Sequence, residues 1–100
     1  RGANLKDAIL VSADLRNINL DDANLENAWL DGTQLGGAYL RRSNLEGASM
    51  TDVHMKNADL TGSNLKDATL LFTNLKHVIM EGVTLCNTMI AVDNVIYSGC

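Results

Sequence analysis

Residues 23–40 read ANLENAWLDGTQLGGAYL, and this stretch contains the pattern that runs through the whole chain. A large aliphatic residue recurs at every fifth position, beginning here with Leu25 and Leu30. Followed outward, the period of five continues without interruption from residue 3 to residue 90, and Leu fills fourteen of the eighteen central positions. The other four central positions hold Met50, Met55, Met80 and Ile90. One repeated unit therefore accounts for about nine-tenths of the 100 residues.

A second set of small residues lies two positions before each central residue. Ala fills nine of these positions, as in Ala23 and Ala28, and the position between the two sets is most often Asn or Asp. Small, polar and large residues in this order favour three residues of strand with both apolar side chains on one face. The two remaining residues break the alternation, and the spacing does not match the apolar period of a helix. The unit is therefore predicted to be a short strand followed by a corner.

Repetition of a short strand and a corner predicts a coiled chain. Successive coils would stack through backbone hydrogen bonds at the usual strand spacing of about 4.8 Å. A pentapeptide cannot bury its two apolar side chains alone, so neighbouring coils share their stability. The absence of proline suits a chain that repeats one backbone conformation.

Three runs carry a resemblance to a known family: ANLKDAILVSADLRN, ANLENAWLDGTQLGGAYL and ADLTGSNLKDATL. They resemble the pentapeptide-repeat family, whose consensus is A(D/N)LXX. The resemblance implies an all-β fold, namely a right-handed quadrilateral β-helix with four pentapeptides in each coil. Eighteen units would then form about four to five coils, a rod on the order of 22 Å long at the usual strand spacing.

If four units make a coil, residues twenty positions apart stack on the same face. One face then collects apolar residues at outward positions: Ile9, Val11, Trp29, Leu71, Phe72 and Met89. An exposed apolar patch of this kind is typical of a surface that binds a partner. We therefore predict a protein partner at this face. Two other interpretations stay open: the corner residues could pack over their neighbours, or a segment missing from this sequence could cover them.

The other three faces are polar. One carries a column of amides that is predicted to hydrogen-bond up the stack: Asn4, Asn24, Asn44 and Asn64. Another is mildly basic and carries, beside Asp14, the residues Arg16, His54, Lys56, Lys76 and His77. The last places Arg41 and Arg42 near Asp21, Asp22, Asp59 and Glu81. Neither of these two faces forms a continuous groove of one charge with aromatic residues, so single-stranded nucleic acid is not an expected partner.

Composition and pattern exclude several classes of function. The formal net charge is −4, which gives no electrostatic reason to bind nucleic acid or an anionic membrane. No apolar run is long enough to span a bilayer, so membrane insertion is not expected. A prism with a filled axis offers no cleft for catalysis, and the two histidines and two cysteines do not form a zinc-like set. We therefore predict no enzyme activity, no catalytic residue, no cofactor and no metal site.

The repeat decays near the C-terminus. Asp93 falls on a position that should hold a small inward residue, and carboxylates are not buried unpaired. We therefore predict that residues 1–92 form the repeat domain and that residues 93–100 form a short irregular capping tail. A cap at this end would protect the open edge of the last coil.

Two cysteines flank the decay, Cys86 at an outward corner and Cys100 at the last position. They can meet only if the tail leaves the coil, and two free thiols are the alternative. The ending LCNT…SGC resembles that of cyanobacterial and chloroplast-type members of the family, some of which are lumenal and carry such a disulfide. The resemblance implies a Cys86–Cys100 disulfide and an oxidising compartment such as the thylakoid lumen, whereas free thiols would suit the cytoplasm.

Three functions fit these observations. The first is a non-enzymatic scaffold that binds a protein partner in a photosynthetic or cyanobacterial setting. The second follows from the branch of the family that mimics DNA and interacts with gyrase, although the twelve carboxylates of this chain scatter over all four faces. The third is a repeat domain of a larger adaptor or effector. Arg1 and Gly2 occupy the corner of a preceding unit, so the repeat is expected to extend upstream of this sequence.

The disulfide leads to a direct chemical test. A bond from Cys86 to Cys100 would close a loop of about fifteen residues, which the chain-entropy model credits with roughly 3 kcal/mol of stability. Titration of the unfolded, unreduced protein with a thiol reagent is expected to detect no free thiol. Two titratable thiols would refute the pairing and would remove the main physical support for an oxidising compartment.

Overall fold

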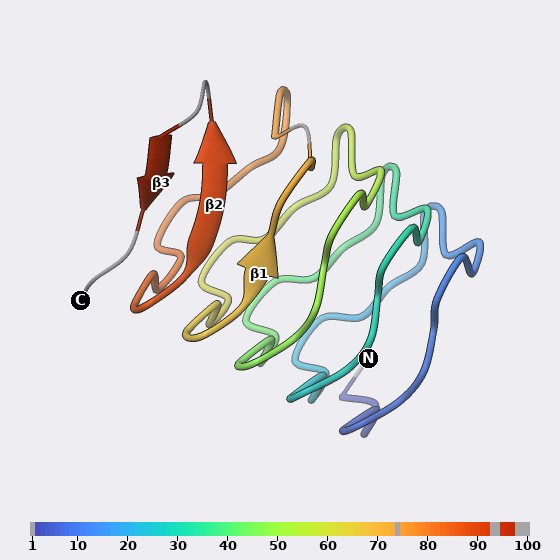
Figure 1. The fold of residues 1–100 in the computed structure, drawn as a ribbon. Coiled ribbons are helices and arrows are strands. Elements are labelled where there is room, and N and C mark those ends of the chain that lie inside the picture. Colours follow the sequence, from blue (N-terminus) through green and yellow to red (C-terminus); the bar gives the residue numbers. More distant parts are fainter. Residues whose placement is uncertain (1, 74, 93–94, 98–100) are drawn as a thin grey trace.

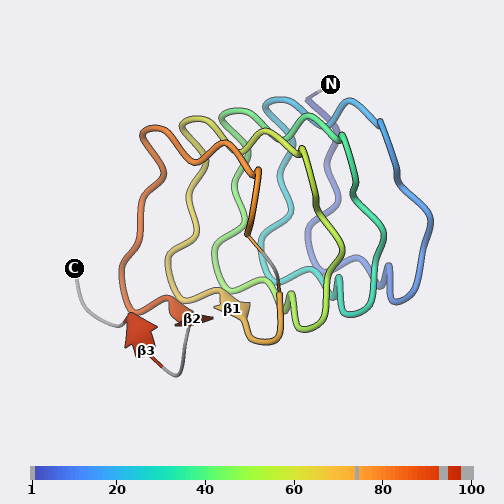
Figure 2. The same ribbon diagram turned by 90° about the horizontal axis from the view of Figure 1, so that it is seen from above.

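A computed structural model describes residues 2–73, 75–92 and 95–97. Parallel bridges join residues that lie twenty positions apart, one bridge for each pentapeptide of the first turn: Asn4 to Asn24, Ile9 to Trp29, Asp14 to Gln34, and Asn19 to Tyr39. Four pentapeptides therefore make one turn of the chain. The turns stack along one axis from the N-terminal to the C-terminal end (Figures 1 and 2). The described part of the chain contains strands and bridges but no helix, and its fold is β-helix-like.

Three short strands form a sheet at the C-terminal end of the stack, in the order β1-β2-β3. They are β1 (Thr69–Leu70), β2 (Met89–Val92) and β3 (Val95–Tyr97). Strand β2 pairs in parallel with β1, which continues the register of the coils. Strand β3 pairs antiparallel with β2, with Ile90 opposite Tyr97 and Val92 opposite Val95 (Figure 1). The chain therefore reverses its direction after β2.

This reversal differs from the irregular tail that the sequence predicted. Residues 95–97 form regular strand, because each of them can pair with the exposed edge of β2. Residues 93, 94 and 98–100 lie outside the described part of the chain. The domain boundary between residues 92 and 93 stays a prediction.

Backbone hydrogen bonds hold each coil to the next. The N–H of Leu25 donates to the carbonyl of Asn44 at 2.7 Å, and the N–H of Asn27 donates to that of Glu46 at 2.8 Å. In return, the N–H of Asn44 donates to the carbonyl of Ala23 at 2.9 Å. The same three bonds recur from unit to unit, so the pentapeptide satisfies most of its backbone groups through its neighbours in the stack.

The corners explain why Asn, Asp and Gly are frequent in the second corner position. Every residue at this position from Asp7 to Asn87 has a positive φ, as a type II turn requires at its third residue. Eight of these residues are Asn or Asp and five are Gly, the types that adopt this conformation at the least cost. The exceptions are Ser12, Arg42, Phe72 and His77.

The outward Asn and Asp residues have a local role that differs from the predicted amide ladder. Asn24 Oδ1 accepts the backbone N–H of Glu26 at 3.1 Å, and Asn64 Oδ1 accepts that of Lys66 at 3.0 Å. Only one amide of the column donates to another among the described residues, Asn64 to Asn44 at 3.5 Å. The predicted ladder is thus formed at one step among the described residues. At the other corners the side-chain oxygen accepts the first corner N–H, which has no backbone acceptor.

The core is a filled axis of aliphatic side chains. The central residues of the middle coils, such as Leu25, Leu45 and Leu65, are fully buried, and Ala28 and Ala48 pack beneath them. In the first coil Leu5, Leu10 and Leu15 are only partly buried, because no described coil precedes them, whereas Leu20 is buried. Burial is therefore greatest where a coil has a neighbour on both sides, as expected when each unit depends on adjacent ones.

Polar residues also occupy some inward positions, and most have a backbone partner. The Thr33 hydroxyl donates to the carbonyl of Leu10 at 2.7 Å, and the Ser43 hydroxyl donates to that of Leu40 at 2.7 Å. Ser63 is the exception among the described residues: its side chain is fully buried and its Oγ has no hydrogen-bond partner. A buried hydroxyl without a partner lowers stability.

We expect Ser63→Ala to raise the free energy of unfolding by about 1–2 kcal/mol, because the substitution removes an unsatisfied polar group and leaves an apolar one of similar size. The matched control is Ser43→Ala, which deletes a bonded hydroxyl and is expected to lower the free energy of unfolding by about 1 kcal/mol. Denaturant unfolding of both variants measures the difference. Equal destabilisation by the two changes would show that Ser63 has a partner in solution.

Candidate functional site: an apolar side and a basic cavity

The apolar residues that the sequence singled out lie on one side of the stack. A single column of bridged residues carries Ile9, Trp29, Ser49, Thr69 and Met89 in successive coils. The corner next to this column has two positions in each unit. Val11 and Leu71 occupy the first corner position, and Phe72 occupies the second. The predicted register thus brings all six of the predicted residues to the same side.

They form two clusters rather than one patch. The N-terminal apolar cluster consists of Ile9, Val11 and Trp29, and the C-terminal apolar cluster consists of Leu71, Phe72 and Met89. Between the clusters, Asp31 Oδ1 accepts the Ser49 hydroxyl at 2.8 Å and the Thr51 N–H at 2.9 Å. This polar band arises because Ser49 replaces the usual Asn or Asp, so that the Thr51 N–H finds its acceptor in the preceding coil instead.

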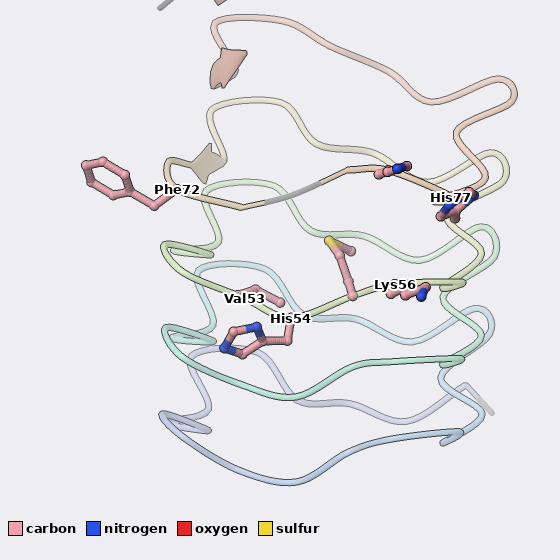
Figure 3. Close-up of a pocket in the computed structure, with 7 residues that line it drawn as sticks. Val53, His54, Lys56, Phe72 and His77 are labelled. Atoms are coloured by element: carbon pink, nitrogen blue, oxygen red, sulfur yellow. The ribbon is translucent and has the colours of Figure 1, made fainter. Parts of the chain in front are cut away.

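The two clusters differ in exposure. Ile9 is 78% exposed and Trp29 is 55% exposed, while Leu71 is half-buried against its own chain. Phe72 is 81% exposed, the highest value among the large apolar side chains of the described residues. Its ring projects outward from the corner, away from the coils (Figure 3).

Phe72 combines this exposure with an unfavourable backbone. Its φ is +57°, whereas the residue at the same corner of the preceding coils is Gly32 and then Asp52. A bulky residue in this region is a true outlier and costs on the order of 1–3 kcal/mol. Arg42 is the other long side chain at such a position, and it is held by an ion pair with Asp22 at 2.8 Å. Because the Phe72 side chain is largely exposed, contacts between its ring and the rest of the chain can offset little of this strain.

Three exposed apolar residues were not predicted, and one of them is the central residue Leu85, which is 39% exposed. The other two are outward residues. Tyr39 and Ile79 lie in another column, with Asn19 and Asp59, and are 46% and 50% exposed. The Arg41 guanidinium lies over the Tyr39 ring, 5.2 Å from its centre. Both residues stand at the outward position that normally holds Asn or Asp, and this was the signal in the sequence that could have identified them.

A cavity of about 330 Å³ opens between two successive coils, next to the C-terminal apolar cluster. The described residues that line it are Val53, His54, Met55, Lys56, Phe72, Lys76 and His77. His54 and Lys56 come from one coil and His77 comes from the next (Figure 3). All four basic residues belong to the face that the sequence described as mildly basic, but their convergence on a cavity was not predicted.

Among the described residues, Asp21 is the only buried carboxylate, at 3% side-chain exposure. It accepts the Arg41 backbone N–H at 2.9 Å and the Arg41 guanidinium through both oxygens. Position 39 holds Tyr in place of the usual Asn or Asp, so no local side-chain oxygen accepts the Arg41 N–H. Asp21 of the preceding coil accepts this N–H instead. Hydrogen bonds from the Arg41 side chain hold the pKa of Asp21 below its ordinary value, against the opposing effect of burial.

Asp14 forms a second ion pair, with Arg16 at 2.7 Å, but on the open surface. Hydrogen bonds from Arg16 lower the pKa of Asp14 from 3.8 to about 2. Both side chains are more than half exposed. Solvent and salt screen such a pair, so it contributes little to stability despite the large shift.

Only one of the two cysteines in the predicted disulfide, Cys86, lies within the described residues. Cys86 is half-buried at its corner, and its backbone N–H donates to the Thr88 hydroxyl at 3.1 Å. Cys100 lies outside the described residues, so the pairing stays a prediction.

Two further searches cover the described residues alone. Within residues 2–73, 75–92 and 95–97, no three His, Cys, Asp or Glu side chains are grouped so that they could hold a metal ion. The same part of the chain has no helix long and apolar enough to cross a bilayer.

The chain belongs to the pentapeptide repeat family. The family profile described as pentapeptide repeats matches it in eight copies, over residues 1–35, 18–57, 30–67 and 54–88. These matches cover the same residues in which the structure repeats every twenty positions. No curated protein matches the chain significantly.

Solved structures of pentapeptide repeat proteins resemble the chain. HetL from the cyanobacterium Nostoc sp. strain PCC 7120, which is involved in regulation of heterocyst differentiation, is 26% identical over 97% of this chain and 52% of its own, with a TM-score of 0.48. A protein from the Arabidopsis thaliana thylakoid lumen is 21% identical over 97% of this chain and 70% of its own, with a TM-score of 0.37. QnrB1, a plasmid-mediated fluoroquinolone resistance protein, is 14% identical over 84% of this chain and 57% of its own, with a TM-score of 0.43. The chain thus spans about half the length of HetL.

The buried pair predicts how stability depends on pH. Because the folded-state pKa of Asp21 is lowered, its contribution is present above the unfolded value of about 3.9 and is lost as the pH falls through the folded value. We expect Asp21→Asn to lower the free energy of unfolding at pH 7 by about 1.5–3 kcal/mol and to weaken the decline of the melting temperature below about pH 4.

Asp14→Asn is the control, because it removes an ion pair that is exposed to solvent. It is expected to change the melting temperature little at pH 7. Thermal melts of both variants from neutral to acid pH make the comparison. An unchanged acid profile in Asp21→Asn would contradict the role assigned to the buried pair.

Proposed function

We propose that this protein is a non-enzymatic scaffold that binds a protein partner through the side of the stack that carries both apolar clusters, with Phe72 as the central contact. The observation that carries the proposal is the combination of 81% exposure and a positive φ at Phe72. Asn, Asp or Gly at this corner would cost less and would expose no ring. Large exposed rings commonly supply much of the binding energy of an interface, so a partner that covers Phe72 would account for both features.

The scaffold in this proposal is a right-handed quadrilateral β-helix of four to five coils, closed after residue 92 by a cap. The parallel bridges at intervals of twenty residues support four units in each coil. The antiparallel pairing of β3 with β2 supports a cap, because it occupies the edge to which another strand could otherwise bind.

The proposal also includes a compartment. A Cys86–Cys100 disulfide would persist in an oxidising environment, of which the thylakoid lumen of a photosynthetic cell is one. Membership of the pentapeptide repeat family is compatible with this setting. The thiol titration described above tests its chemical basis.

The absence of enzyme activity is proposed on two grounds. Aliphatic side chains fill the axis of the coils, so no cleft enters the body of the repeat where residues such as Leu25 and Leu45 are fully buried. The described residues that line the cavity between the coils include no Ser, Thr, Cys, Asp or Glu. It therefore lacks the side chains that most often act as nucleophile or as carboxylate acid and base.

DNA mimicry is the less favoured function. A mimic has to present carboxylates at the spacing of phosphates along one face. In this chain Asp14, Asp21 and Asp22 are each paired with an arginine. Their negative charge is therefore largely neutralised within the protein.

The scaffold function predicts that replacing Phe72 increases the stability of the fold but weakens partner binding. We expect Phe72→Asn to raise the free energy of unfolding by about 1 kcal/mol, because Asn adopts a positive φ with less strain. The same change is expected to weaken partner binding at least about tenfold. Trp29→Ser should weaken binding while leaving the stability nearly unchanged.

The partner would be isolated from an extract of the source organism, purified, and titrated against each variant by calorimetry. Ile79→Asn is the matched control, because it removes an outward apolar residue from another column. Its affinity for the partner should equal that of the unmodified protein. Loss of affinity in Ile79→Asn alone, or in none of the variants, would overturn the assignment of this side.

A further inference from the structure

Four carboxylates flank the apolar side of the stack near its centre. Glu26 and Glu46 occupy the first position of the corner on one side of the Trp29 column. Asp31 and Asp52 lie at the corner on the other side of this column. These four residues, the flanking carboxylates, all belong to the two middle coils, residues 23–62. The centre of the apolar side is therefore acidic, with one apolar cluster towards each end.

The flanking carboxylates differ from those of the other faces in their partners. On the other faces three aspartates are each paired with an arginine. Within the described part of the chain, no ion pair involves any flanking carboxylate. Asp31 accepts hydrogen bonds from Ser49 and Thr51, but both donors are neutral. Glu26 and Glu46 lie in one column, where like charges on neighbouring strands destabilise the pairing, so a cationic partner would remove this repulsion.

Two lysines stand in the column of the flanking glutamates, one coil beyond them at each end. They are Lys6 and Lys66, and neither forms an ion pair with a described residue. Each is followed directly by an aspartate, Asp7 or Asp67, so the charges at these two coils largely cancel. The excess negative charge of this side therefore lies at its centre.

The backbone of the apolar side is already bonded within the stack. The Trp29 N–H donates to the carbonyl of Ala8 at 2.9 Å, and the Leu30 N–H donates to that of Ser49 at 2.8 Å. These bonds run along the column, from each coil to the coils on either side. An extended peptide adds to a β-structure by pairing with free backbone groups at an edge. A partner at this column must therefore bind through side chains.

The spacing of the apolar residues along the axis suits an α-helix. Ile9 and Met89 stand at the two ends of one column, and four successive pairings join them. At about 4.8 Å for each pairing, the two residues lie roughly 19 Å apart. A helix rises about 1.5 Å per residue, so about 13 residues span this distance, and its pitch of about 5.4 Å is close to the height of one coil. Successive turns of a helix can therefore contact successive coils.

We propose that the apolar side binds a basic amphipathic helix of the partner protein, laid along the axis of the stack. The apolar residues of the helix contact the N-terminal and C-terminal apolar clusters, and Lys or Arg residues of its central turns pair with the flanking carboxylates. The same carboxylates repel an acidic helix, so they set the sign of the partner's charge. This inference rests on the proposed scaffold function and adds the chemistry of the partner.

The test uses synthetic peptides and the fluorescence of Trp29, the only tryptophan of the chain. The probe is a peptide of about 14 residues with Leu on one helical face and Lys on the other, and without aromatic residues. One control peptide has the same composition in scrambled order, and a second has Glu in place of Lys. The basic amphipathic peptide is expected to move the Trp29 emission to shorter wavelength and to bind the full chain at least about tenfold more tightly than either control.

The double variant Glu26→Gln/Glu46→Gln should weaken the binding of the basic peptide at least about tenfold. The matched control is Asp59→Asn/Glu81→Gln, which changes the net charge equally but lies away from the apolar side. It should alter the dissociation constant less than about twofold. Each substitution keeps the approximate size of the side chain, so both variants are expected to fold.

Two single variants test whether the helix lies along the stack. Ile9→Asn changes one end of the apolar side and Phe72→Asn changes the other, and Asn is common at outward positions and at corners. Each should weaken the binding of the peptide at least about fivefold, because one helix contacts both clusters.

Equal binding of the basic and scrambled peptides, or equal loss in the two double variants, would overturn the proposal, because either shows only a general attraction of cations. Loss in one of the two single variants alone would confine the ligand to one cluster and would also overturn it. If the isolated partner depends on Phe72 and Trp29 while the basic peptide does not bind, the scaffold function stands and the helix is wrong. If neither the partner nor the peptide depends on this side, both proposals fail.

Discussion

The backbone hydrogen bonds between coils are the constraint on which the rest of the structure depends. Central residues from Leu5 to Leu65 whose acceptors are described donate to a carbonyl nineteen positions later, as Leu25 does to Asn44. This interval holds as long as every unit contains five residues. The bonds fix which side chains point inward, because strand residues alternate between the two faces. They also leave the first N–H of each corner without a backbone acceptor. The side-chain oxygen of Asn24, and of other Asn and Asp residues at the same position, fills that need.

The same constraint explains the residues that depart from the consensus. Where Tyr39 or Ser49 replaces Asn or Asp, the corner N–H loses its local acceptor, and Asp21 or Asp31 of the preceding coil accepts it instead. A change at one position is thus compensated by a residue about twenty positions earlier. This coupling places Asp21 in a buried site and makes Asp31 part of a polar band that divides the apolar side.

The candidate functional residues lie where the chain departs most from the repeated pattern. Phe72 has a positive φ without the small or polar side chain that suits it. The cavity that Phe72 helps to line lies beside this corner. Each unit that matches the repeated pattern adds stability to the stack. Residues that depart from the pattern at a cost in stability are therefore the best candidates for roles in binding.

The period of five residues, the four units in each coil and the shared side of Ile9, Trp29 and Phe72 could be predicted from the sequence, because they depend on local alternation and on counting. The division of that side by Asp31 and the burial of Asp21 could not, since each depends on an acceptor in another coil. The reversal of β3 along β2 was missed because strand pairing depends on an edge that only the folded coils create. The sequence alone determined the repeat and its register. The tertiary structure decided which acceptor these corner N–H groups find, because the Arg41 and Thr51 N–H groups bond to carboxylates that only the stacking of whole turns brings near.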